Sequence, residues 1–284
     1  MLDDGGQTLT DGRAAIRDRV PVHRSSAVEV AGRVWRSLAQ ISLFAVFAAG
    51  GALFTLLIAP GLRAIRRDPR ARVAAGRRCV SGLLAAYTQA MRWLGLITLD
   101  YAGLEHLQRR GVLVVANHPT LIDAFFLLAR VDHLVPIAKR SLLANPFTRG
   151  ALRAADYEIN DDGPRLIESC GARLARGESV LLFPEGTRSD ATDAVRLTRF
   201  AAQLAVRSGC LVVPVTVFAS ERMLTRDTHW WLAPRRRPRF GVIAHAPVDP
   251  RPFAAAGDPP LAARRLTEHL QRFYTRELTF REFI

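Results

Sequence analysis

An uncharged stretch near the N-terminus constrains the fold of this chain more than any other feature. The segment Leu38–Ala59 reads LAQISLFAVFAAGGALFTLLIA, 22 residues without Asp, Glu, Lys or Arg. A helix of about 20 apolar residues crosses the roughly 30 Å hydrocarbon core of a bilayer. A buried core helix is the alternative, but such a helix seldom stays uncharged around its whole circumference. The stretch begins too late and runs too long for an ordinary cleaved signal peptide. The sequence therefore predicts membrane insertion or deep interfacial embedding.

Basic residues flank this segment on both sides. Arg33 and Arg36 precede it. The arginines that follow it are Arg63, Arg66, Arg67, Arg70, Arg72, Arg77 and Arg78. The heavier C-terminal cluster favours a cytoplasmic position for that side, although two basic flanks also fit a half-inserted hairpin. Residues 79–97 are amphipathic or mostly apolar, so we expect them to lie on the membrane beside the anchor.

The charge balance narrows the class of partner. The chain has 40 Lys and Arg against 26 Asp and Glu, a net charge of +14. This excess suits a nucleic acid, a membrane surface or an acidic ligand, and a genome rich in Arg codons would also produce it. Hydrophobic residues make up 49% of the chain, too many for a disordered protein. The three cysteines, Cys79, Cys170 and Cys210, are far apart, which predicts buried free thiols and neither a disulfide framework nor a zinc cluster.

From about residue 100, short β-rich runs alternate with longer helical stretches. The expected strands are Val112–Ala116, Leu134–Ala138, Val180–Phe183, Leu211–Val217 and Phe240–Ala244. The expected helices are Leu121–Arg130, Pro164–Arg176, Val195–Ser208 and Leu261–Glu277. Such alternation predicts an α/β fold, with a mixed, largely parallel sheet flanked by helices, after the N-terminal membrane-anchoring helix. The runs are apolar throughout, as in strands buried on both faces.

The first segment with candidate catalytic residues reads VVANHPTLIDAFF. The expected strand ends at Asn117–His118, and Pro119 suits the first turn of a helix because its missing N–H costs nothing there. Asp123 follows one turn later, where a carboxylate can accept the imidazole Nδ1–H and leave Nε2 free to take a proton from a hydroxyl. Helix capping by Asn or His, with Asp facing the helix dipole, explains the same residues without catalysis.

The second such segment is SVLLFPEGTRSD, residues 179–190. A buried strand runs into a turn that contains Glu185, Gly186 and Arg188. Glycine permits a tight turn, and a guanidinium at the carboxyl edge of a strand is a fork-shaped phosphate ligand. A polar turn with a surface arginine is the simpler interpretation of this segment taken alone.

Together the two segments resemble the glycerolipid acyltransferase family, which includes the lysophosphatidic acid acyltransferases (1-acyl-sn-glycerol-3-phosphate acyltransferases). The family pattern is H-x-x-x-x-D, then F-P-E-G-T-R, then V-P-V. These motifs match His118 to Asp123, Phe183 to Arg188, and Val213–Pro214–Val215, so the resemblance spans about residues 100–220. Each motif is weak singly, but their order and spacing are hard to meet by chance.

The resemblance implies a glycerol-3-phosphate acyltransferase-like fold and an O-acyltransferase. Acyl-CoA or acyl-carrier protein would be the co-substrate, with no cofactor and no metal. His118 would act as the general base, oriented by Asp123, and Arg188 would bind the acceptor's phosphate. The expected substrate-binding residues are Glu185, Gly186, Thr187 and Arg188. The chain then divides into a polar, loosely ordered segment (1–36), membrane-anchoring and interfacial helices (37–98) and an acyltransferase domain (99–284).

One stretch departs from the family pattern. Members that act on glycerol phosphates usually carry an arginine just after a G-x-x-F-I-D-like strand, whereas Ala155–Asp162 reads ADYEINDD here. Acids replace the expected phosphate ligand, so either Lys139, Arg140 or Arg165 compensates or the acceptor is a different lipid. The reaction type is therefore better determined than the acceptor.

Other functional classes fit less well. The chain has no G-x-S-x-G elbow, P-loop, G-x-G-x-x-G or H-E-x-x-H. A nucleic-acid-binding protein would explain the charge but not the anchor or the motif pair, so we expect membrane lipids and no nucleic acid as partners. A catalytically inactive, membrane-bound lipid-binding module is the alternative. We expect the catalytic domain on the cytoplasmic face of the inner membrane.

A last stretch combines tryptophan and arginine. Thr228–His229–Trp230–Trp231 is followed by Arg235, Arg236, Arg237 and Arg239. Tryptophan with arginine suits a membrane interface, and a solvated basic loop explains the stretch equally well.

Overall fold

A seven-stranded sheet forms the centre of the protein. The computed structural model describes residues 27–160, 164–185, 197–255 and 257–279. The strand order is β1-β7-β6-β2-β5-β3-β4, and every neighbouring pair is parallel except the antiparallel pair β6–β7. The strands are β1 (Thr98–Ala102), β2 (Leu113–Ala116), β3 (Leu134–Lys139), β4 (Glu158–Asn160), β5 (Ser179–Leu182), β6 (Val212–Ala219) and β7 (Arg239–Ala244). The predicted mixed, largely parallel sheet is confirmed.

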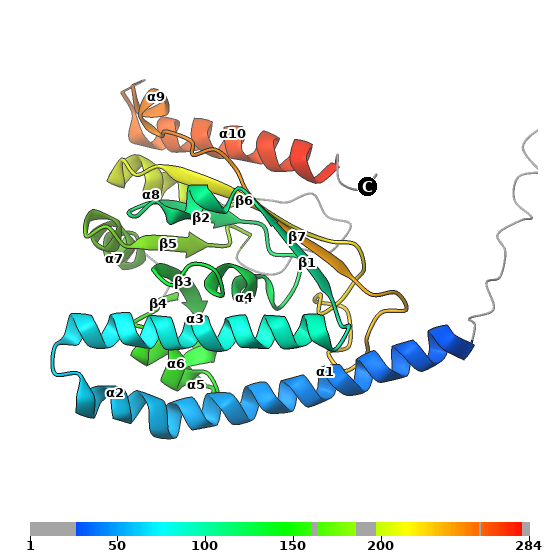
Figure 1. The fold of residues 1–284 in the computed structure, drawn as a ribbon. Coiled ribbons are helices and arrows are strands. Elements are labelled where there is room, and N and C mark those ends of the chain that lie inside the picture. Colours follow the sequence, from blue (N-terminus) through cyan, green and yellow to red (C-terminus); the bar gives the residue numbers. More distant parts are fainter. Residues whose placement is uncertain (1–26, 161–163, 186–196, 256, 280–284) are drawn as a thin grey trace, which may run out of the picture.

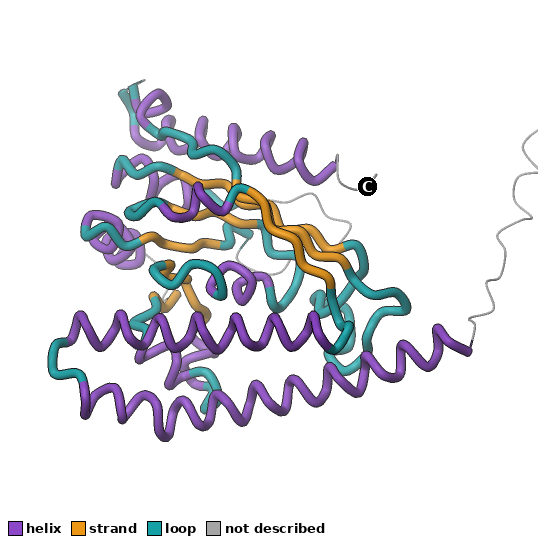
Figure 2. The backbone as a smooth tube through the Cα atoms, in the orientation of Figure 1, coloured by secondary structure: helices purple, strands orange, loops and turns teal. Residues whose placement is uncertain are grey.

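Helices cover both faces of this sheet, and β2 shows why. Successive residues of a strand point to opposite faces. Val114 and Ala116 pack into the core beneath the N-terminal helices, whereas Leu113 and Val115 pack against the other helical layer. The first layer contains α3 (Pro69–Trp93) and α4 (Asp123–Leu128), with α1 (Ala27–Leu53) outside them. The second contains α7 (Pro164–Ala175), α8 (Phe200–Ser208) and α10 (Pro259–Thr279), as Figures 1 and 2 show.

The predicted strands all form, but two strands were missed. β1 contains Asp100 and mixes buried with exposed residues, and β4 has only three half-buried residues. Neither has the continuous apolar run that marks a central strand, because both lie at an edge of the sheet. Three short helices were also missed, because they bury few or no residues and so show no apolar period: α5 (Arg140–Ala144), α6 (Arg149–Ala154) and α9 (Arg251–Ala254).

The apolar N-terminal segment forms one long, continuous helical rod. α1 leads through a π-helical turn (Phe54–Ile58) into α2 (Ala59–Ile65). Pro60 lies directly after this irregular turn, because proline has no N–H to donate to the carbonyl groups of the preceding helical turn. Residues 27–36, which were expected to be loosely ordered, belong to α1 and are helical. Residues 1–26 lie outside the described part of the chain.

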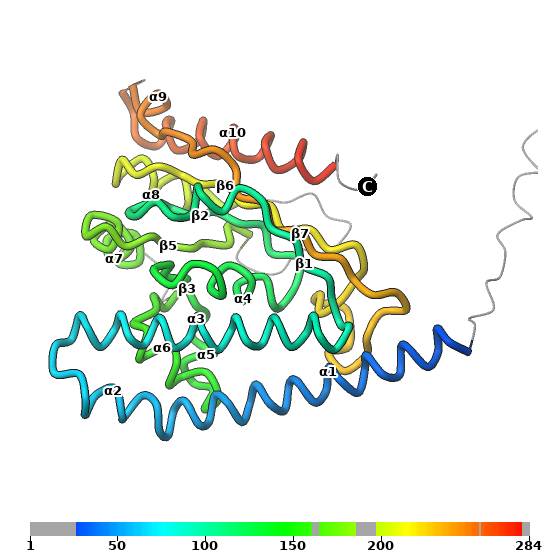
Figure 3. Tube along the Cα trace, viewed as in Figure 1, coloured from blue at the N-terminus to red at the C-terminus, as the bar shows by residue number. Residues whose placement is uncertain are grey.

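This helical rod lies along the domain (Figure 3). A Cβ added to Gly51 would come within 1.9 Å of the carbonyl oxygen of Phe147, and one added to Gly150 would meet the Thr55 hydroxyl at 2.3 Å. Glycines at these two points therefore let the backbones meet closely. Much of the rod is exposed or half-buried: only 11% of the residues in its most apolar 18-residue stretch are buried. By length and composition, Ala27–Ile65 is long and apolar enough to cross a membrane.

The helix α3 packs one face on the domain, and its expected position on the membrane beside the anchor stays a prediction. Val80, Leu84 and Met91 are buried against the domain, so much of its apolar periodicity serves the core. Arg77, counted above in the basic flank of the anchor, is also buried: its Nε donates to the Ala155 carbonyl oxygen at 2.9 Å. This contact joins two residues 78 positions apart, which helical periodicity does not reveal.

The three cysteines are free thiols, as predicted. Cys170 is fully buried, and burial raises the pKa of its thiol to about 12. Cys79 and Cys210 are only half-buried, less than the prediction of buried thiols implies.

Candidate active site

The carboxyl end of β2 is held in place by an asparagine. The Asn117 side-chain amide donates to the carbonyl oxygen of Val217 at 2.8 Å, and its side-chain oxygen accepts from the Val217 N–H at 2.7 Å. Both residues are buried. A buried pair of hydrogen bonds of this kind fixes the turn after β2 against β6. The sequence suggests only a helix-capping role for Asn117, because nothing local points to a partner 100 residues away.

His118 follows at once, and its imidazole meets Asp123. The distance from Nδ1 to the Asp123 Oδ2 is 2.9 Å. The Asp123 side chain is fully buried, whereas the His118 side chain keeps 19% of its surface exposed. A buried carboxylate on Nδ1 fixes the imidazole orientation and tautomer, and leaves the other ring nitrogen for chemistry. The spacing predicted from the sequence therefore brings the two side chains together.

Thr120 holds the Asp123 carboxylate in place with two hydrogen bonds. The Thr120 N–H donates to Asp123 Oδ2 at 2.7 Å, and the Thr120 hydroxyl donates to Asp123 Oδ1. Because of these bonds, residues 117–122 form a turn and α4 begins at Asp123, later than the helix start expected near Pro119 or Leu121. The T-x-x-D spacing is the sequence signal for such a bond, and it points to Thr120 as a hydrogen-bond partner of Asp123.

The second motif approaches His118 from the neighbouring strand. β2 and β5 are parallel, with Val115 opposite Leu182, so both strands end at the same edge. The His118 N–H donates to Glu185 Oε1 at 3.0 Å, and the imidazole stacks on the Phe183 ring with 4.2 Å between centroids. The structure thus joins the start of the second motif to the first. The other expected site residues, Gly186, Thr187 and Arg188, lie outside the described residues.

The comparisons with known proteins agree with this geometry. Residues 98–218 match the family model described as Acyltransferase. This part of the chain, somewhat less than half of it, is therefore similar to an acyltransferase domain. The 1-acyl-sn-glycerol-3-phosphate acyltransferase of Pseudomonas aeruginosa is 30% identical over 42% of this chain and 49% of its own length. The enzyme of the same name from Borreliella burgdorferi is 25% identical over 51% of this chain and 61% of its own length.

A solved structure extends the likeness to the N-terminal helices. The 1-acyl-sn-glycerophosphate (LPA) acyltransferase PlsC from Thermotoga maritima superposes with a TM-score of 0.67 at 23% identity. The match covers 89% of this chain and 98% of that one, which shows a common fold. The sequence alignments span only about half the length of these curated relatives.

The third motif lies inside the sheet. Val213, Pro214 and Val215 belong to β6 and pair with Val114, Val115 and Ala116 of β2. The Tyr274 hydroxyl of α10 also donates to the Val115 carbonyl oxygen, at 2.6 Å. In the described residues these contacts are structural: they support the strand that ends at His118.

The acidic stretch that departs from the family pattern is part of an ion-pair cluster. Arg173 Nη1 lies 3.0 Å from Asp156 and 3.0 Å from Glu178, and its Nε lies 2.6 Å from Glu158. Arg77 also meets Glu178, at 3.2 Å. These acids hold α3, α7 and the sheet together. Asp161 and Asp162 lie outside the described residues, and compensation by Lys139, Arg140 or Arg165 stays a prediction.

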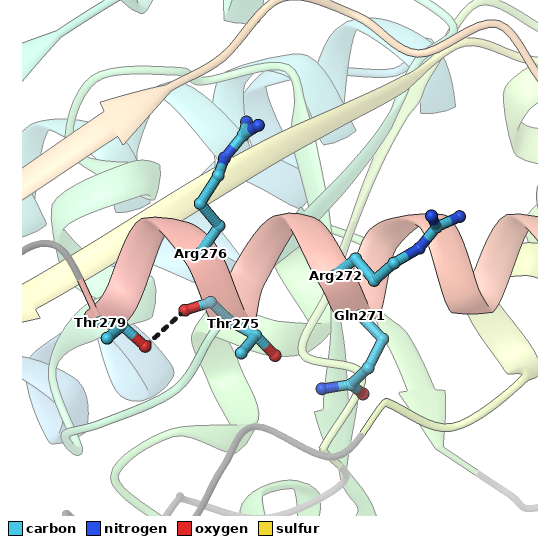
Figure 4. A pocket seen from close by; sticks show the side chains of 5 residues that line it. All are labelled: Gln271, Arg272, Thr275, Arg276 and Thr279. Atoms are coloured by element: carbon cyan, nitrogen blue, oxygen red, sulfur yellow. Dashed lines mark hydrogen bonds between the residues drawn. The ribbon is translucent and has the colours of Figure 1, made fainter.

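Two surface hollows of the described chain lie elsewhere. Figure 4 shows one along α10, lined by Gln271, Arg272, Thr275, Arg276 and Thr279. The other lies between the helical rod and α6, lined by Thr55, Ala59, Pro60, Arg63, Arg149, Gly150 and Arg153. Neither contains His118 or Asp123. Among the described residues, no three His, Cys, Asp or Glu side chains are grouped to hold a metal ion.

Proposed function

We propose that this protein transfers a fatty acyl group to the hydroxyl of lysophosphatidic acid or a related lysophospholipid. The donor would be acyl-CoA or acyl-carrier protein. The observation that carries the proposal is the 2.9 Å contact between His118 Nδ1 and the fully buried Asp123 carboxylate at the sheet edge. The names of the relatives from Pseudomonas aeruginosa and Borreliella burgdorferi support the acceptor class.

The chemistry follows from the geometry of this pair. Asp123 accepts the Nδ1–H, so His118 Nε2 takes the proton of the acceptor hydroxyl as its oxygen attacks the thioester carbonyl carbon. The C–S bond then breaks, and the thiolate leaves with the proton carried by the imidazolium. Asp123 stabilises that imidazolium without taking its proton. The products are the acylated lipid and the free thiol, and no cofactor or metal takes part.

The second motif would hold the acceptor. Glu185 already fixes the backbone of His118, which supports a role in shaping the acceptor site together with Gly186 and Thr187. We assign the acceptor's phosphate to Arg188, because a guanidinium can hold it with two parallel hydrogen bonds and so aim the hydroxyl at the base. Arg188→Ala should raise the KM for the acceptor far more than for the donor, with Arg188→Lys in between. Equal effects on both substrates would exclude this role.

The reaction would take place at a membrane surface. The helical rod Ala27–Ile65 exposes most of its apolar surface while the domain lies along it, which supports embedding of the rod in the bilayer beside the domain. We place the catalytic domain on the cytoplasmic face of the inner membrane, on the side of the heavier arginine cluster.

The decisive test is acyl transfer by membranes that contain the full chain. Labelled acyl-CoA and acyl-carrier protein are offered with a panel of lysolipids, with and without a headgroup phosphate. We expect His118→Ala to lose about a hundred- to ten-thousand-fold in rate, and Asp123→Asn to be severely impaired. His106→Ala, on a partly exposed surface histidine, is the matched control. Near-normal turnover by folded His118→Ala contradicts the mechanism. Wild-type binding of lysolipid without any turnover would favour the inactive lipid-binding module.

A further inference from the structure

All four tryptophans of the chain lie at one end of the molecule, on its surface. Their exposed fractions are 56% for Trp35, 81% for Trp93, 47% for Trp230 and 45% for Trp231. Tryptophan is highly buried on average in soluble proteins. They come from α1, the end of α3 and the loop between β6 and β7, so tertiary structure, not sequence proximity, brings them together. Exposed apolar side chains gathered in this way mark an interaction surface.

The loop between β6 and β7 is fastened along α1. We call residues 229–237 the Trp-Arg segment. The Ala233 carbonyl oxygen accepts from the Arg33 side chain at 3.0 Å, and the Trp230 ring meets the Phe44 ring edge-on at 5.2 Å. The α1 residues that contact the segment are Arg33, Arg36, Ser37, Gln40 and Phe44. They recur every three or four residues, so one face of α1 contacts the segment over three helical turns.

The end of α3 completes this arrangement. The Trp35 Nε1–H donates to the Leu94 carbonyl oxygen at 3.0 Å, and Arg237 donates to the Arg92 carbonyl oxygen at 3.0 Å. α1, the end of α3 and the Trp-Arg segment therefore form one continuous surface. Val34, Leu38 and Ile41 of α1 are exposed beside it.

The arginines of this surface keep their positive charge unpaired. Within the described chain, no carboxylate lies at ion-pair distance from Arg33, Arg36, Arg235, Arg236 or Arg237. Arg33, Arg36 and Arg237 donate instead to neutral backbone carbonyls. The buried Arg173, in contrast, meets three carboxylates. Unpaired guanidiniums next to exposed indole rings match the headgroup layer of an anionic bilayer, which offers phosphates above and hydrocarbon below.

The geometry points to a second membrane contact, separate from the apolar rod: the Trp-Arg segment docks on anionic lipid headgroups beside α1. A helix embedded by its apolar surface alone can rotate about its axis, whereas contacts from α1, α3 and the segment fix one face toward the lipid. The loop that carries the segment also meets the catalytic turn, because the Leu121 N–H donates to the Leu224 carbonyl oxygen at 3.0 Å. Docking of the segment would thus hold the turn that carries His118 at a fixed height above the bilayer.

Tryptophan fluorescence of the full chain in vesicles tests this contact. A variant that keeps only Trp231 (Trp35→Phe, Trp93→Phe, Trp230→Phe) is inserted into phosphatidylcholine–phosphatidylglycerol vesicles. Bromine on the acyl chains of either lipid, at equal mole fraction, quenches an indole that touches that lipid. We expect quenching of Trp231, stronger with brominated phosphatidylglycerol. Wild type gives the same readout if the variant does not fold, since all four tryptophans lie in this surface.

Charge variants separate headgroup recognition from simple embedding. Arg235→Gln/Arg236→Gln removes two exposed guanidiniums of the segment, each of which should favour the anionic lipid by about fivefold. Arg265→Gln/Arg272→Gln makes the same charge change on α10, across the sheet from α1 (Figure 1), and should leave the preference unchanged. A Trp231 that stays unquenched in membrane-bound protein overturns the proposal and identifies a solvated loop. Quenching without a phosphatidylglycerol preference, or with one that the segment variant retains, also overturns it.

Discussion

Removal of the Thr120 hydroxyl should weaken both the fold and the catalysis proposed for His118. In Thr120→Val the side chain keeps its branched shape but loses the O–H that donates to Asp123 Oδ1. Both Thr120 and Asp123 have 0% of their surface exposed, so water does not replace the lost donor. A hydrogen bond to a charged group contributes about 1.5–3 kcal/mol. We expect the free energy of unfolding to fall by about that amount, which lowers the Tm by about 2–4 °C per kcal/mol.

The same bond helps to aim the carboxylate at His118 Nδ1. If this hydrogen bond stabilises the transition state to the same extent, kcat for acyl transfer should drop about ten- to a hundredfold in Thr120→Val. Thr120→Ser keeps the hydroxyl and is the matched control, with kcat expected within about threefold of wild type. Initial rates with saturating acyl donor and lysolipid, together with thermal unfolding in the same detergent, measure both effects. A folded Thr120→Val protein with wild-type kcat would refute the idea that this hydroxyl positions Asp123.

Three further perturbations test the remaining structure. Arg173→Met should lower the free energy of unfolding by about 3 kcal/mol in urea titrations, because it leaves Glu158 and its neighbours without their buried cation. The control Arg176→Met changes a 57% exposed side chain that also meets Glu178, and should lower the free energy of unfolding by less than about 1 kcal/mol. Equal losses in the two variants would contradict the role of burial. Burial raises the pKa of Tyr101 to about 12, and raises those of Tyr157 and Tyr274 as well. The unfolded chain therefore ionises first, and stability should fall above about pH 10 by roughly 1.4 kcal/mol per pH unit for each tyrosine; phenolate absorbance that rises before unfolding would contradict this order. The full chain should stay with membranes in about 1 M salt, which screens charges without weakening burial in hydrocarbon; release by salt alone would exclude insertion of the rod.

The central strands and the contact between His118 and Asp123 are properties of the local sequence. β2, β5 and β6 are buried on both faces, so their residues form continuous apolar runs that could be recognised without any knowledge of their partners. The pairing of His118 with Asp123 depends only on a strand that ends, a turn and five residues of chain. Such features are fixed over short distances, and the sequence alone was sufficient to predict them.

Tertiary contacts decided the rest. Edge strands such as β1 have one neighbour and a mixed environment, so their sequences carry no clear period. Asn117 owes its role to Val217, and Arg77 owes its burial to Ala155 and Glu178, in each case a partner at least 78 residues away. The gathering of four tryptophans from three segments has the same origin. Local periodicity shows which face of a helix or strand is apolar. Long-range packing determines which element packs on that face and which charged side chains become buried.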